Sequence, residues 1–175
     1  MERGDRGSTL RGLLAMVDAM GGRLESRIRL QKSAYLLGAA GIIDFRITSF
    51  KYHHYGPYSR ALSDALQDAV ASGLLKETLQ EYGDEQTKYT YELTNKGTVW
   101  LSENGDDVDP RVQQVAPLFK DAPWRALELA ATTLFVERDE RIGNRVSALS
   151  RAIELKPPCA EFRSDAEQLL ERIHL

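Results

Sequence analysis

Residues 50–59 constrain the fold more than any other part of this 175-residue chain. They read Phe-Lys-Tyr-His-His-Tyr-Gly-Pro-Tyr-Ser and precede an amphipathic segment. Gly56 permits a backbone bend that other residues resist, and Pro57 fixes φ at a value suited to the start of a helix. Ser59 can cap the helix that follows. The segment therefore predicts a strand, a turn at Gly56-Pro57 and a helix.

Two helices are expected before this segment. The first begins at Ser8 or Thr9, either of which can act as an N-cap, and ends at the glycine pair 21–22. Ser26 opens the second helix, over residues 27–38, and its basic residues are expected to point outward into solvent. A third helix is expected over residues 58–72, where apolar residues recur at helical spacing.

The remaining chain is read as a hairpin followed by helices. Strand-like alternation on both sides of a Gly83-Asp84 turn predicts a hairpin, or wing, over residues 74–93, and Thr94 can cap the next helix. Downstream, helices are expected over residues 110–120, 123–136, 142–155 and 159–173.

The predicted fold class is mostly α (α+β), with a winged-helix-like N-terminal lobe containing one β-hairpin over residues 1–103. A helical C-terminal lobe over residues 110–175 is expected to pack on it as one compact unit.

Charge is unevenly distributed along the chain, although the net charge is only -3. Residues 1–55 carry +4, residues 56–109 carry -7 and residues 110–175 are neutral. Nucleic-acid binding depends on basic surfaces that neutralise phosphates, and only the first segment offers one. Contact with nucleic acid is therefore expected to be weak.

Location is inferred from segments that the sequence does not contain. The sequence shows no apolar run of about 18 residues, which a membrane-spanning helix needs. The amino terminus lacks the apolar stretch of a secretory signal. We therefore expect a cytoplasmic protein with no membrane association.

Cys159 is the only cysteine, so no internal disulfide can form.

The sequence offers no complete set of catalytic or metal-binding residues. Adjacent residues of a strand point to opposite faces, so His53 and His54 are not expected to share a metal ion. Neither Ser59 nor Cys159 lies in a nucleophile motif, and no phosphate-binding glycine loop is present. The expectation is a protein that is not an enzyme, with no cofactor and no metal.

Three segments carry a family resemblance: residues 30–37, 50–59 and 91–97. They resemble the YwgA-like family and, more distantly, the Panacea (SocA-like) antitoxin domain. The aromatic and histidine-rich turn fits the YwgA-like version better. The resemblance to Panacea domains implies an antitoxin that binds and neutralises toxin proteins, and it transfers no catalytic residue.

These observations lead to one functional hypothesis and one alternative. The first is a non-enzymatic protein-interaction module, antitoxin-like or an accessory subunit of a prokaryotic toxin or defence system, which binds a larger effector protein such as a toxin, helicase or nuclease. The alternative is a winged-helix DNA-binding transcriptional regulator, and a homodimer fits either reading. We expect basic and aromatic residues to form one mixed partner-binding patch. Its predicted members are Arg27, Arg29, Lys32, Lys51, His54, Tyr55, Tyr58 and Arg60.

Overall fold

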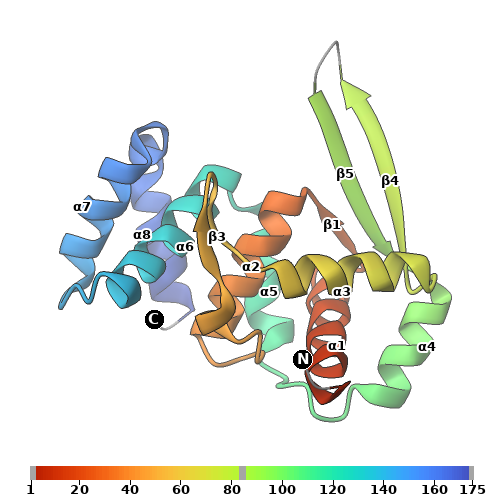
Figure 1. The fold of residues 1–175 in the computed structure, drawn as a ribbon. Helices are drawn as coiled ribbons and strands as arrows, with labels where there is room; N and C mark the ends of the chain where they lie inside the picture. Colours follow the sequence, from red (N-terminus) through yellow and green to blue (C-terminus); the bar gives the residue numbers. More distant parts are fainter. Residues whose placement is uncertain (1–2, 83–85, 174–175) are drawn as a thin grey trace.

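The computed structural model describes residues 3–82 and 86–173 (Figure 1). The amino-terminal part contains three long helices and a three-stranded sheet. In chain order, these elements are α1 (Arg3–Ala19), β1 (Arg23–Glu25), α2 (Arg27–Ala39), α3 (Arg60–Ala71), β4 (Leu75–Tyr82) and β5 (Gln86–Leu93).

The sheet has the topology expected of a winged helix. Its antiparallel strands lie in the order β1-β5-β4, with Leu24 opposite Tyr91 and Thr78 opposite Thr90. The predicted hairpin is confirmed as β4–β5, the wing, which projects from the helices in Figure 1. The predicted turn at Gly83-Asp84 lies outside the described residues. The short strand β1 was not predicted, because three residues carry too little pattern to reveal a strand.

Side-chain caps begin several helices where the sequence predicts them. The hydroxyl of Ser26 accepts a hydrogen bond from the backbone N–H of Ile28 at the start of α2. Ser59 caps α3 in the same way, and Thr94 caps α4 (Asn95–Asn104). The prediction for α1 was wrong, since that helix begins at Arg3 and runs through Ser8 and Thr9.

A short hairpin joins α2 to α3, and we call its residues 51–58 the strap. After the 3-10 turn η1 (Ile47–Ser49), β2 (Lys51–His53) pairs antiparallel with β3 (Gly56–Tyr58). The predicted strand is confirmed, but the chain reverses at residues 54–55 rather than at Gly56-Pro57. Pro57 lies in β3 opposite Tyr52, so the prediction that it starts a helix was wrong.

The carboxy-terminal part is helical, as predicted. Its elements are α5 (Val112–Asp121), α6 (Trp124–Asp139), α7 (Arg145–Leu155), the 3-10 helix η2 (Pro157–Phe162) and α8 (Arg163–Arg172). Every residue of α6 from Ala126 to Val136 is buried. This helix packs against α2 and β3 on one side and against α7, η2 and α8 on the other (Figure 1).

Buried apolar side chains from both parts of the chain form one cluster. At the boundary, the ring of Tyr35 on α2 lies 5.1 Å from that of Phe50 and 6.2 Å from that of Phe135 on α6, measured between centroids. In the part of the chain that the structure describes, no helix combines the length and apolar character needed to cross a bilayer.

Candidate functional site

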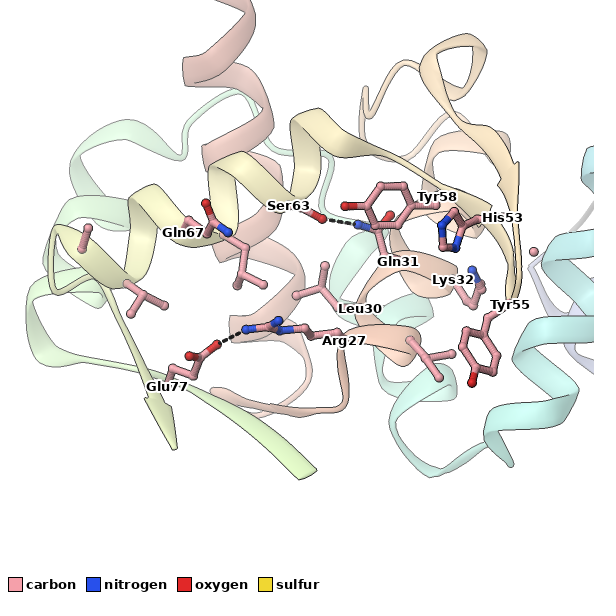
Figure 2. A pocket seen from close by; sticks show the side chains of 15 residues that line it. Arg27, Leu30, Gln31, Lys32, His53, Tyr55, Tyr58, Ser63, Gln67 and Glu77 are labelled. Carbon is pink, nitrogen blue, oxygen red and sulfur yellow. Dashed lines mark hydrogen bonds and ion pairs between the residues drawn. The ribbon is translucent and has the colours of Figure 1, made fainter. Parts of the chain in front are cut away.

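A cavity of about 580 Å³ lies between α2, α3, the strap and the beginning of strand β4 (Figure 2). We call it the groove. Its floor is apolar and includes Leu30, Leu66 and Val70, while Gln31, Ser63 and Gln67 contribute polar groups. Charged and aromatic side chains lie at its two ends. The groove thus combines a large apolar surface with a few polar groups, which is typical of binding sites.

Gln31 fixes the position of α3 against α2. Its side-chain oxygen accepts a hydrogen bond from the backbone N–H of Ser59 at 2.8 Å, and its amide nitrogen donates to Ser59 O at 3.0 Å. The same nitrogen donates to Ser63 Oγ at 2.9 Å, as Figure 2 shows. Because Gln31 is buried and fully engaged, this wall of the groove is rigid.

Arg27 connects α2 to the wing at one end of the groove. It donates to Glu77 Oε2 at 3.0 Å and to Tyr91 Oη at 2.8 Å, and its guanidinium lies 3.8 Å from the ring centroid of Tyr89. Tyr91 Oη also donates to Glu77. Burial alone would raise the pKa of Glu77, but the hydrogen bonds from Tyr91 and Arg27 hold it below its ordinary value. The charge of Arg27 is therefore largely balanced within the molecule.

Lys32 lies at the other end, beneath the strap, with only 2% of its surface exposed. Its Nζ donates to the backbone oxygen of Pro57 at 2.6 Å. Burial lowers the pKa of Lys32 to about 7; the negative charge of Glu128 opposes this shift, and the positive charge of Lys156 adds to it. Figure 2 places Lys32 between His53 and Tyr55.

Behind Lys32, Glu128 and Lys156 complete a buried charged cluster. Lys156 Nζ lies 3.1 Å from Glu128 Oε1 and donates a hydrogen bond to the backbone oxygen of His54. The thiol of Cys159 donates to Glu128 Oε2 at 3.6 Å. Burial and the charge of Glu128 raise the pKa of Cys159 to about 12, so its reactive thiolate form is disfavoured at neutral pH. Lys32 and Lys156 thus hold the strap from below through its backbone carbonyls.

Gly56 allows the strap to lie close to α6. Its φ of +83° is unfavourable for other residues, and a Cβ placed there would lie 2.6 Å from Thr132 Oγ1. Position 56 therefore requires glycine for two reasons: the backbone φ is positive, and no room is left for a side chain beside Thr132.

The structure divides the predicted patch residues among several environments. Arg27, Lys32, Tyr55 and Tyr58 line the groove. The remaining predicted residues do not line it: Arg29, Lys51, His54 and Arg60.

The expectation that all three basic residues of α2 point into solvent was wrong. Arg27 is exposed, but Lys32 is buried. Arg29 is partly buried and donates to the backbone oxygens of Phe119 and, at 2.8 Å, Ala122. Neighbouring carbonyl groups of α5 and the strap attract these cations inward, a tertiary effect that helical periodicity does not reveal. The three basic residues of α2 therefore do not share one solvent-exposed face.

Sequence reasoning missed several residues of the groove. Gln31, Ser63, Gln67 and Glu77 have ordinary polar side chains, and only their placement around one cavity distinguishes them. His53 also lines the groove, and its ring centroid lies 5.4 Å from that of Tyr58.

The expected separation of the two histidines was also wrong. Their ring centroids lie 4.9 Å apart, because His54 lies in the turn and not in the strand. Among the described residues, no group of three or more histidine, cysteine, aspartate or glutamate side chains is arranged to hold a metal ion.

Fold and site together define a winged-helix-like α+β protein in which the strap covers one end of a groove. The chain is similar to the uncharacterized protein YwgA of Bacillus subtilis (strain 168), with 27% identity over 116 residues, or 66% of this chain and 68% of YwgA. This similarity supports the resemblance to YwgA-like proteins, while the relation to the Panacea antitoxin domain stays a prediction. No family model matches the chain.

Proposed function

We propose that this protein is a non-enzymatic protein-interaction module, antitoxin-like or an accessory subunit of a prokaryotic toxin or defence system. In this proposal the groove receives a segment of a larger effector protein. The observation that carries it is the groove itself, which has an apolar floor, polar groups along its walls and two tyrosines, Tyr55 and Tyr58, at the strap end.

The dimensions and rim of the groove support this proposal. A volume of about 580 Å³ is large enough to enclose several side chains of a bound segment. Tyr55 is half exposed at the rim, and Tyr58 is partly buried beside the groove. Tyrosine rings that bury a large area while keeping a polar hydroxyl are common among residues that dominate binding energy.

The experiment blocks the groove without disturbing the core. Ala71 is exposed at the end of α3 and lines the groove, so Ala71→Arg places a long charged side chain there. Ala160→Arg is the matched control, because Ala160 is exposed in η2 and does not line the groove. The unmodified protein, both variants and an effector candidate encoded by a neighbouring gene are purified separately. The affinity of each of the three proteins for the candidate is then measured by titration calorimetry.

We expect Ala71→Arg to weaken binding at least tenfold, while Ala160→Arg binds like the unmodified protein. Equal affinity of all three proteins for the effector would show that the interface lies elsewhere. The absence of binding by any neighbouring gene product to the unmodified protein would contradict the proposed class of partner.

The winged-helix topology favours one alternative, a DNA-binding transcriptional regulator. In helix-turn-helix proteins the second helix of the pair enters the major groove, and α3 holds the corresponding position. This helix carries Arg60 against Asp64 and Asp68, which makes its approach to phosphates unfavourable. Nanomolar, sequence-selective binding to duplex DNA that is lost in Arg60→Ala would favour the regulator over the interaction module.

A further inference from the structure

The buried cluster beneath the strap has an unequal number of charges. Lys32 and Lys156 are two potential cations, and among the residues that the structure describes Glu128 is the one carboxylate buried with them. Glu128 forms its direct ion pair with Lys156. A second buried cation without its own anion is costly, so the cluster favours either a neutral Lys32 or an additional negative charge beside it.

We propose that the groove recognises a carboxylate of the bound partner segment, and that this carboxylate pairs with Lys32. This inference rests on the proposed function, because it names the chemistry of the segment that the groove receives. The carboxylate belongs to an acidic side chain or to the end of the partner's chain.

The surroundings of Lys32 offer several hydrogen-bond donors that a carboxylate can accept from. An ammonium group has three donors, and the described residues give Lys32 Nζ one hydrogen-bond acceptor, the oxygen of Pro57. His53, Tyr55 and Tyr58 surround the same end of the groove and can donate further hydrogen bonds (Figure 2). A carboxylate placed there gains charge-assisted hydrogen bonds from the largely buried ammonium group of Lys32.

The opposite end of the groove is less suited to an anion. Arg27 is already paired with Glu77, whose own charge repels a second carboxylate. Between the two ends, Leu30 and Leu66 offer an apolar surface. The favoured segment therefore has an acidic group at the strap end followed by apolar side chains that extend toward the wing.

The test uses a small probe with this combination of groups. We would titrate the protein with 3-phenylpropionate and, separately, with its neutral amide, and follow binding by NMR at pH 6.5 and low salt. Lys32→Met removes the charge while keeping a side chain of similar length. Lys51→Met is the matched control, because Lys51 is exposed on the strap and does not line the groove.

We expect the carboxylate to bind about tenfold or more tightly than the amide, the range typical of hydrogen bonds to charged groups. The preference is expected to vanish in Lys32→Met and to persist in Lys51→Met. Equal binding of carboxylate and amide to the unmodified protein, or an unchanged preference in a folded Lys32→Met protein, would overturn the inference.

A second measurement applies even if Lys32→Met fails to fold. The pKa of Lys32 in the unmodified protein is followed by NMR of its ¹³Cε nucleus, with and without the carboxylate probe. Pairing with an anion stabilises the charged ammonium, so the pKa is expected to rise when the probe binds. An unchanged pKa at saturating probe would show that the carboxylate does not reach Lys32.

Failure of this inference can be distinguished from failure of the proposed function. If Ala71→Arg abolishes effector binding while Lys32→Met leaves it unchanged, the groove binds the partner without using a carboxylate at Lys32. If the probe binds through Lys32 but the effector binds Ala71→Arg normally, the carboxylate site is real and the proposed role of the groove is wrong.

Discussion

At the scale of single residues, Gly56 is the position where the strap depends most on its sequence. Its positive φ and its approach to Thr132 are separate requirements, and each excludes a side chain. Gly73 provides a natural comparison, since it has a φ of +71° but, its chain neighbours aside, no atom of the described residues lies within 4 Å of the position that a Cβ would occupy.

We therefore predict that Gly56→Ala destabilises the protein more than Gly73→Ala. The positive φ costs about 1–2 kcal/mol in either variant, and crowding against Thr132 adds about 1–3 kcal/mol at Gly56 alone. At about 2–4 °C per kcal/mol for a chain of this size, the Tm of Gly56→Ala is expected to fall by roughly 4–20 °C. Calorimetric melting checks this, and equal Tm values for the two variants would show that the strap yields to accommodate the methyl group.

Lys32 makes stability depend on pH. Its pKa is about 7 in the folded protein and near 10.5 in the unfolded chain. Between these values the unfolded chain binds more protons than the folded protein, so raising the pH stabilises the fold. Below pH 7 both states hold the proton, and the full cost of the buried charge is present.

The pH-dependent contribution of Lys32 to stability is expected to disappear in Lys32→Met. The free energy of unfolding of the unmodified protein, minus that of the variant, is predicted to rise steadily from pH 7 to pH 9. Cys159 has the opposite effect at higher pH because its pKa is raised, but it is present in both proteins and cancels in the difference. Urea denaturation at several pH values gives the comparison, and a difference that stays constant with pH would mean that Lys32 titrates normally.

At the scale of elements, local signals in the sequence predict most of the secondary structure. Ser59 and Thr94 start helices because their hydroxyls satisfy free backbone N–H groups, a short-range effect that the sequence contains in full. The β4–β5 hairpin likewise follows from alternation along two adjacent segments. Periodicity correctly identified the carboxy-terminal helices to within a few residues.

The groove depends on long-range contacts, which local signals do not contain. Lys32 reads as a solvent-exposed helix residue, and it is buried because the strap and α6 cover it. Gln31 belongs to the candidate site through its hydrogen bonds to a residue 28 positions away. The aromatic segment was correctly identified as unusual, but the contacts that explain it come from α6 and from Lys156, about 100 residues later in the chain.

At the scale of the whole molecule, the two predicted lobes share an interface of polar contacts and apolar packing. Arg138 on α6 donates to the backbone oxygen of Ile47 at 2.6 Å, and Arg111 donates to that of Gly41 at 3.2 Å. Together with the bond from Lys156 to His54, these contacts bind the segment between α2 and α3 to the carboxy-terminal part. Loss of either part would leave buried groups of the other without partners.

The last prediction is that both parts unfold in a single cooperative transition. The two tryptophans of the chain report on them separately, because Trp100 lies on α4 in the predicted N-terminal lobe and Trp124 begins α6 in the C-terminal one. In Trp100→Phe and Trp124→Phe, the fluorescence of the remaining tryptophan follows one part at a time, and circular dichroism of the same samples follows the helices of both. We expect the fluorescence and circular dichroism curves in urea to coincide within each variant, because the core and the strap contacts cross the boundary between the parts. Fluorescence midpoints that differ from those of circular dichroism would show that residues 1–103 and 110–175 unfold as independent domains, and that the strap adds little to their coupling.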